Sequence, residues 1–338
     1  MTLAVTFTSW LLALHLLSAF ALAGSMALFW YLIVASRSVD SPEKTLAMGP
    51  MAAVGTNVVR AGSVGTLVFG IWLAIRLDHV QVWSGWIIAA IVLLVIAAAA
   101  GSRSGAEYER AMRKAEELDA AGQTGPSAEL LALNRTSRGL WLHTIASVAV
   151  FLILVDMIWK PGANEIVGVF PRAKDFNISF PLLVHITGAM ILVGGMLGAA
   201  AALILARGDQ RKLKVGYYSL LFVAFPGLVL TKLGATMIWH KESTHSLVGA
   251  AFPHPSTDPR WIEIGGTALD GGGGLLVLAL ILGWFGLRRF DGKTDFLAKV
   301  PVVGKWSGER LLSITTIISV VLLAGYVLAI WAMSTKPA

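Results

Sequence analysis

Residues 15–37, HLLSAFALAGSMALFWYLIVASR, determine the fold, because a related stretch returns as residues 185–207, HITGAMILVGGMLGAAAALILAR. Three landmarks coincide when the first stretch is shifted by 170 residues: His15 on His185, Gly24 on Gly194 and Arg37 on Arg207. Each stretch is apolar, long enough to cross a bilayer as a helix, and has one histidine near its start. The sequence therefore predicts a membrane helix that occurs in two copies.

The composition indicates a protein that crosses the membrane several times. Of 338 residues, 56% are hydrophobic and 14% are charged, whereas soluble domains carry about 25% charged residues. There is no cysteine, which excludes disulfides, thiolate metal sites and cysteine nucleophiles. The net charge of +7 is explained by basic loops on one side of a bilayer, so we expect lipid and not nucleic acid as the partner.

The hydropathy pattern predicts eight membrane-spanning helices. Their expected ranges are 9–35, 58–77, 81–101, 139–159, 179–206, 214–239, 264–287 and 311–333. Lysine and arginine are more frequent after the first, third, fifth and seventh spans than after the others. The positive-inside rule places those segments in the cytoplasm and both termini outside. We expect a multi-pass protein of the cytoplasmic (inner) membrane of a bacterium.

The fourth and eighth spans also repeat. With a shift of 172 residues, three landmarks coincide: Arg138 on Arg310, Ser147 on Ser319 and Trp159 on Trp331. The second and sixth spans match poorly, as do the third and seventh. Because an even number of spans separates the copies, the two halves have the same orientation, with a pseudo-twofold axis along the membrane normal. The predicted fold is all-α, with eight transmembrane helices in two tandem, parallel-related four-helix bundles.

These halves define two predicted modules. The first covers residues 1–165 and the second covers residues 166–338. Within the first, residues of about 102–137 are mixed in charge and helix-prone. They predict a cytoplasmic helical hairpin, interrupted between Gly122 and Pro126, whose simplest interpretation is a solvated connector.

Short motifs in the first half resemble known membrane modules. They are an early histidine in span one, Gly-Ile-Trp-Leu at 70–73 and Asp-Met-Ile-Trp-Lys-Pro at 156–161. This pattern is similar to an uncharacterised predicted integral membrane protein family related to the copper-resistance D proteins. More distantly it resembles the four-helix membrane protoporphyrinogen oxidases, which implies haem at the early histidine. The second half departs from it, because span six lacks Gly-x-Trp-Leu and Thr315 stands where span four has His143.

His15 and His185 are the main candidate ligands. Each is expected about 8–10 Å below the outer start of its span, at 1.5 Å per residue. Imidazole is a common ligand of haem iron and other transition metals. One iron could be held by both histidines, or each could form a separate site. Otherwise the rings would only form hydrogen bonds between helices or reach the interface.

Other polar residues form a second group of candidates. Lys232 in span six could pair with Asp270 in span seven, bind a haem propionate, or extend outward to the interface. Asp270 precedes four glycines, which predicts an unwound stretch or a very close helix contact. His240 and His245 could form a surface metal site. Five methionines could serve copper as soft ligands or simply pack: Met26, Met190, Met196, Met237 and Met333.

Three functional hypotheses follow. The first is a b-type haem-binding redox or electron-transfer subunit, an oxidoreductase component if it is an enzyme. It would connect a membrane carrier with other respiratory-chain subunits or a cytochrome c, using His15 and His185 as axial ligands and Lys232 against a propionate. The second is a copper or small-solute permease of the copper-resistance D type. The third is a non-catalytic accessory subunit. No catalytic residue is assigned, because no nucleophilic triad or carboxylate pair is evident.

Overall fold

A computed structural model describes residues 6–77, 80–161, 176–206, 208–244, 260–293 and 306–335. These residues form helices and connecting turns, with no β-strand among them. The helices are α1 (Phe7–Ser36), α2 (Pro42–Arg76), α3 (Gly85–Ala120), α4 (Ala128–Asn134), α5 (Ser137–Trp159), α6 (Phe176–Leu205), α7 (Gln210–Ser219), the π-helical turn η1 (Leu220–Ala224), α8 (Phe225–Thr244), α9 (Arg260–Phe290) and α10 (Gly308–Thr335).

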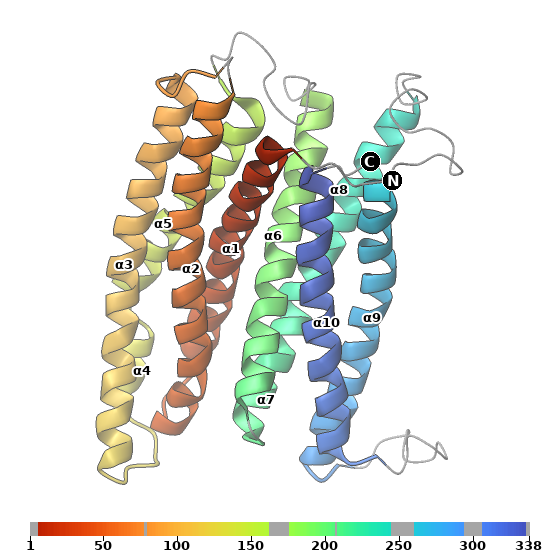
Figure 1. Cartoon of the computed structure of the whole chain (residues 1–338). Helices are drawn as coiled ribbons and strands as arrows, with labels where there is room; N and C mark the ends of the chain where they lie inside the picture. The colour runs from red at the N-terminus through yellow and green to blue at the C-terminus, as the bar shows by residue number, and fades with distance from the viewer. Residues whose placement is uncertain are drawn as a thin grey trace.

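Eight helical segments of the described part are long and apolar enough to cross a membrane. The short α4 leads into α5 as one segment, and α7, η1 and α8 together form another. The start of α1 and the end of α10 lie at the same end of the molecule (Figure 1), as an even number of spans requires. The predicted multi-pass membrane architecture is therefore confirmed.

The second span begins much earlier than the sequence predicted. We expected residues 58–77, whereas α2 covers Pro42–Arg76. Pro42 occupies the first turn, where its missing N–H costs nothing, and Pro50 lies inside the helix. Proline disrupts interior helix hydrogen bonds, so Pro50 and the polar residues before it resembled a loop. The helix continues because Met48 and Met51 are buried against α1 and α6 residues.

The predicted helical hairpin is present, but it is a packed structure and not a solvated connector. α3 extends unbroken to Ala120, and α4 turns back beneath the α1–α2 connection. Leu130 is fully buried in a small apolar cluster with alanines of α3. The side-chain amide of Asn134 donates to the carbonyl of Val39, at 2.9 Å, and to the hydroxyl of Thr45, at 3.2 Å.

The helices pack mainly as antiparallel pairs, α1 with α2, α3 with α5, α6 with α8, and α9 with α10. Helices α1 to α5 lie on one side of the molecule and α6 to α10 on the other (Figure 1). The two sides meet where α1 crosses α6, at Gly24 and Gly194. A Cβ added to Gly24 would lie 3.1 Å from the Gly194 nitrogen, so only small residues permit this crossing.

The four glycines after Asp270 do not unwind the helix, since α9 runs continuously through them. The predicted unwound stretch is therefore wrong, while close contact with another helix is found at two of the four positions, including Gly273, whose Cβ would lie 3.3 Å from the Leu228 side chain of α8. A Cβ at Gly272 would lie 3.0 Å from the hydroxyl oxygen of Tyr326 on α10, whereas Gly274 meets nothing within 4 Å. Packing against α10 holds α9 helical despite the low helix propensity of glycine.

Candidate functional site

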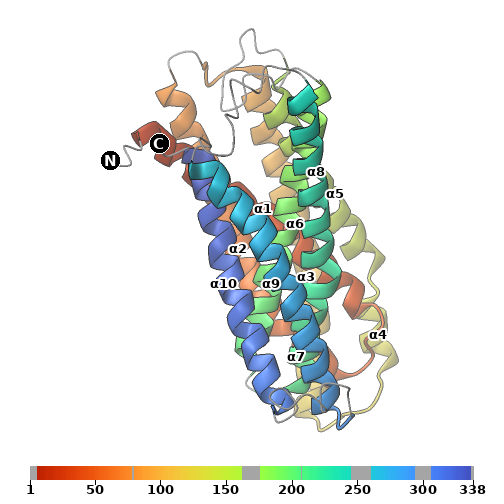
Figure 2. The ribbon, with the colours of Figure 1, turned by 90° about the vertical axis from the view of Figure 1, so that its right-hand side faces the viewer.

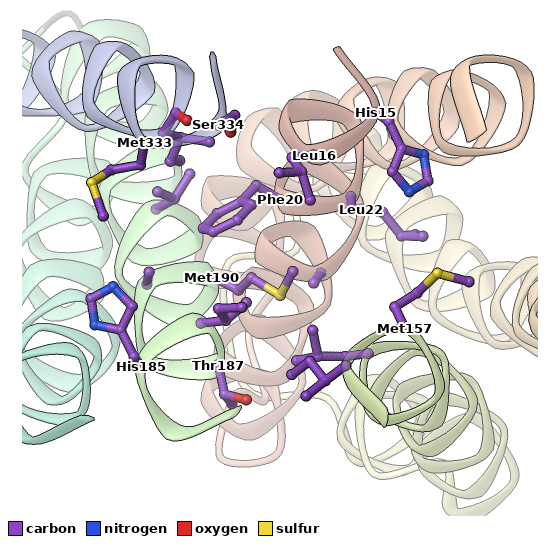
Figure 3. Close-up of a pocket in the computed structure, with 18 of the residues that line it drawn as sticks. His15, Leu16, Phe20, Leu22, Met157, His185, Thr187, Met190, Met333 and Ser334 are labelled. Carbon is purple, nitrogen blue, oxygen red and sulfur yellow. Dashed lines mark hydrogen bonds between the residues drawn. The ribbon is translucent and has the colours of Figure 1, made fainter. Parts of the chain in front are cut away.

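A large cavity of about 2050 Å³ lies among the helices and contains both candidate histidines in its wall. Small-molecule sites usually occupy about 300–1,000 Å³, so this space can accept a large ligand or more than one. Its lining is predominantly apolar, with residues contributed by both sides of the molecule. Figure 3 shows His15 and His185 among these lining side chains.

The ring of His15 is fixed by a backbone carbonyl. Its Nδ1 lies 3.0 Å from the carbonyl oxygen of Thr66 on α2. Because a carbonyl oxygen only accepts, the ring carries its proton on Nδ1 and leaves a lone pair on Nε2. Gly70, one turn further along α2, makes room for the ring, since a Cβ there would lie 2.9 Å from Nδ1.

His185 repeats this arrangement in the second half. Its Nδ1 lies 3.0 Å from the carbonyl oxygen of Thr231 on α8, which again assigns the proton to Nδ1. Gly234 lies directly against the His185 backbone, where any Cβ would clash. Among the described residues, Nε2 of neither histidine has a hydrogen-bond partner. Both rings therefore present an acceptor nitrogen within an apolar cavity.

The helices that hold the two rings also share a packing register. A Cβ on Gly62 would meet the backbone nitrogen of Leu22, and a Cβ on Gly227 would clash with that of Leu192. Gly62 and Gly227 each precede the carbonyl-bearing threonine by four residues. Spans two and six match poorly over their full length, but both contain this Gly-x-x-x-Thr pattern.

The two rings are not brought together. Each is bonded to the neighbouring helix of its own half, and Figure 3 shows them apart, with Phe20 and Met190 between them. This arrangement does not favour the expectation of one iron held by both histidines. It corresponds to the alternative that we left open, with one site in each half.

The predicted ion pair between Lys232 and Asp270 is present. It joins α8 to α9, and both side chains line the cavity. Lys232 therefore already has a carboxylate partner, so its charge is not fully available to bind a haem propionate. The side chains of His240 and His245, the predicted surface metal site, lie outside the described residues.

Sequence reasoning missed several residues of the cavity wall. Met157 of α5 lines it, as Met333 of α10 does in the other half (Figure 3). Lys160, directly after α5, adopts a left-handed conformation with φ of 43° and places its ammonium 5.4 Å from the Trp86 ring. Burial lowers the pKa of Lys160, whose charge is close enough to interact with His15.

The donor set limits which metals the site can hold. The described residues contain no group of three or more His, Asp or Glu side chains that could bind a metal ion. Zinc and copper sites usually take three or four protein ligands. Haem iron needs only one or two from the protein, because the porphyrin supplies four nitrogens.

The fold and cavity define a multi-pass, all-helical integral membrane protein with a histidine-bearing apolar interior. Residues 9–161 match the model of a family described as "Predicted integral membrane protein (DUF2269)". Our expected resemblance to an uncharacterised integral membrane protein family is confirmed over that range. No curated protein and no solved structure matches the chain.

Proposed function

We propose that this membrane protein binds haem b through His15 and His185 and acts as a redox or electron-transfer subunit. The observation that carries the proposal is the repeated ring geometry, with Nδ1–H on a backbone carbonyl and Nε2 unpartnered among the described residues. Metal-binding histidines usually donate their second ring N–H to a carbonyl or carboxylate, which fixes the ring and increases its basicity.

The cavity fits a tetrapyrrole better than a bare metal ion. Its walls are mainly apolar and its volume of about 2050 Å³ accommodates more than one large ligand. The separated rings imply one centre in each half. Lys160, near His15, is a cation suited to a propionate, and in the other half Lys232 would interact with one only by sharing its charge with Asp270. When bound, haem would supply one-electron transfer, and His15 and His185 would be the residues that hold it.

A difference spectrum tests the proposal. The purified full-length protein should show a Soret band and reduced-minus-oxidised α and β bands of a b-type haem. His15→Ala and His185→Ala should each remove about half of the haem, and the double variant nearly all of it. His143→Ala is the matched control, because this histidine is buried behind Trp30 and does not itself line the cavity.

The result that overturns the haem proposal is also clear. A colourless wild-type preparation with normal helical content, expressed under haem-replete conditions, would exclude it. Full assembly and activity of the double histidine variant would then favour the accessory-subunit hypothesis, in which the rings only fasten helices together.

A second candidate function is a copper or small-solute permease of the copper-resistance D type. The specific observation in its favour is the set of four cavity-lining thioethers, two in each half: Met26 and Met157, and Met190 and Met333. Thioether and imidazole groups together suit Cu(I). Copper accumulation by cells that express the protein should fall in a Met157→Leu/Met333→Leu variant, whereas haem content should not change. Unaltered copper uptake would count against transport.

We also infer that the chain is two related four-helix halves, with both termini outside the cytoplasmic membrane of a bacterium. The matching ring contacts and glycine register support the relationship, and the basic loops support the orientation. The chain has no cysteine, so single cysteines can report topology. Cysteines near either terminus should react with an impermeant maleimide in intact spheroplasts, and a Gln123→Cys residue should react only after lysis. The opposite labelling pattern would show that both termini lie in the cytoplasm.

A further inference from the structure

Both α8 and α9 contribute residues to the cavity wall. These helices diverge toward the end where α9 begins (Figure 2). Thr236 of α8 and Gly266 of α9 both line the cavity and are exposed. The space between α8 and α9 at these two residues is called the α8–α9 opening below, and it adjoins the His185 side of the cavity.

An ion pair crosses this opening. The Lys232 ammonium of α8 contacts the Asp270 carboxylate of α9, and their side chains are 53% and 65% exposed. Lys232 follows Thr231, whose carbonyl holds His185, so the pair lies at the depth of that ring. This is about 8–10 Å below the outer start of the spans, by the rise of 1.5 Å per residue. Charged groups at that depth are costly and usually serve a function.

A third polar group lies deeper in the same cavity. Tyr326 of α10 is 6% exposed, and its buried hydroxyl has no hydrogen-bond partner among the described residues. It reaches α9 at Gly272, two residues beyond Asp270. An unsatisfied buried hydroxyl is unfavourable, so a ligand that bonds to it would recover this free energy.

We propose that the α8–α9 opening admits a lipid-soluble quinone or quinol from the outer leaflet, with its ring held by Tyr326 and the Lys232–Asp270 pair. Lysine donates to a ring carbonyl, aspartate accepts from a ring hydroxyl, and tyrosine can do either, so both redox forms find partners. The isoprenoid tail stays in the bilayer. This inference rests on the proposed redox function, because it names the membrane carrier.

The depth and charge of the opening distinguish this ligand from a phospholipid. Phospholipid headgroups lie at the interface, above the hydrocarbon region that helices span. The pair is electrically neutral and offers no net positive charge to a phosphate. A neutral ring with two oxygen atoms satisfies the polar groups without bringing another charge below the interface, which hydrocarbon disfavours.

Quinone binding to the full-length protein in nanodiscs provides the test. The probe is a benzoquinone with one isoprene unit, followed by quenching of tryptophan fluorescence, since Trp261 lines the cavity. Gly266→Leu should weaken binding at least tenfold by filling the opening. Gly325→Leu should bind like wild type. A Cβ at either glycine meets nothing within 4 Å, so both variants should fold.

Two further variants separate this inference from the haem proposal. Tyr326→Phe keeps the ring shape, removes the hydroxyl, and should weaken binding about fivefold, the equivalent of one net hydrogen bond. His185→Ala should lose haem but keep quinone binding. Absent or unsaturable quenching in wild type, equal loss in both leucine variants, or wild-type affinity in both Gly266→Leu and Tyr326→Phe would each overturn the proposal. Loss of binding only in His185→Ala would place the quinone elsewhere and overturn it as well.

Discussion

At the scale of single residues, the ring position and the tautomer of the two histidines are set by neighbours whose side chains take no part. Thr66 contributes only its backbone carbonyl to His15, and Gly70 contributes only the absence of a Cβ. The carbonyl fixes the tautomer and the glycine permits the ring to lie against α2. A lone imidazole in a membrane helix would be a costly polar group, whereas here one nitrogen is satisfied and the other is available.

Gly70→Val should displace the His15 ring, because the new Cβ would lie 2.9 Å from two ring atoms. Overpacking of this kind costs about 1–3 kcal/mol. We expect a lower midpoint of thermal unfolding in detergent, measured by circular dichroism, and a loss of haem from the His15 centre alone. Gly85→Val is the control, since its Cβ meets nothing within 4 Å. Equal midpoints for the two variants would show that α2 relaxes around the added side chain.

Asn134→Ala should destabilise the packing of α4 against the α1–α2 connection. The asparagine is 2% exposed, and its amide bonds to Val39 and Thr45. Removing it leaves buried acceptors unsatisfied, at about 1–3 kcal/mol. Faster proteolysis at the α3–α4 turn of the purified protein would report the loss. Asn57→Ala, at an exposed position of α2, should be cleaved at the wild-type rate, and similar rates for both variants would contradict the prediction.

At the scale of elements, tertiary packing overrides local propensity twice. Pro50 lies inside α2, and four consecutive glycines lie inside α9. Either feature would end a helix that had to be stable alone. In a membrane the unpaired backbone would be exposed to hydrocarbon, so the helical hydrogen bonds are retained wherever they can form. Because Gly272 has no Cβ, the Tyr326 hydroxyl can lie directly against α9.

The α8–α9 ion pair should show strong coupling in a double-mutant cycle. Lys232→Met leaves an unpaired aspartate in a membrane-spanning segment, and Asp270→Leu leaves an unpaired lysine. Each single variant should unfold at a lower temperature than the double variant, with a coupling energy of about 0.5–3 kcal/mol. Thermal midpoints in nanodiscs provide the measurement. Strictly additive effects would mean that the two charges act independently.

At the scale of the whole molecule, a few close contacts hold the two sides together. The α1–α6 crossing at Gly24 and Gly194 lies within the spans. Near the start of α2, Arg211 of α7 forms an ion pair with Glu43 of α2. The hydroxyl of Tyr31 also donates to the carbonyl of Val215, at 2.8 Å. Because lipid is as apolar as these helices, close backbone packing and polar bonds, and not hydrophobic burial, hold the sides together.

Gly194→Leu should separate the two sides, because its Cβ would clash with the carbonyl oxygen of Gly24. Fragments 1–168 and 169–338, expressed together, should co-purify through a tag on one of them. The leucine variant should reduce recovery of the untagged fragment at least tenfold. Gly325→Leu, in open space on α10, should leave it unchanged. Undiminished recovery with Gly194→Leu would show that other contacts dominate the assembly.

The sequence by itself determined the class of protein, because the length of each apolar run sets whether a helix spans the bilayer. It also singled out His15 and His185, and the pairing of Lys232 with Asp270, since ionisable residues are rare in such runs. Helix ends at Pro42 and Ala120 were not predictable, because packing against other helices and not local propensity decides them.

Only the tertiary structure decided what surrounds each histidine. A backbone carbonyl has no signature in the sequence, and neither has the space left by a missing Cβ. The separation of the two rings, the opening between α8 and α9 and the unpartnered hydroxyl of Tyr326 all depend on how tilted helices cross. Those crossings follow from contacts between residues far apart in the chain, which hydropathy along the chain does not encode.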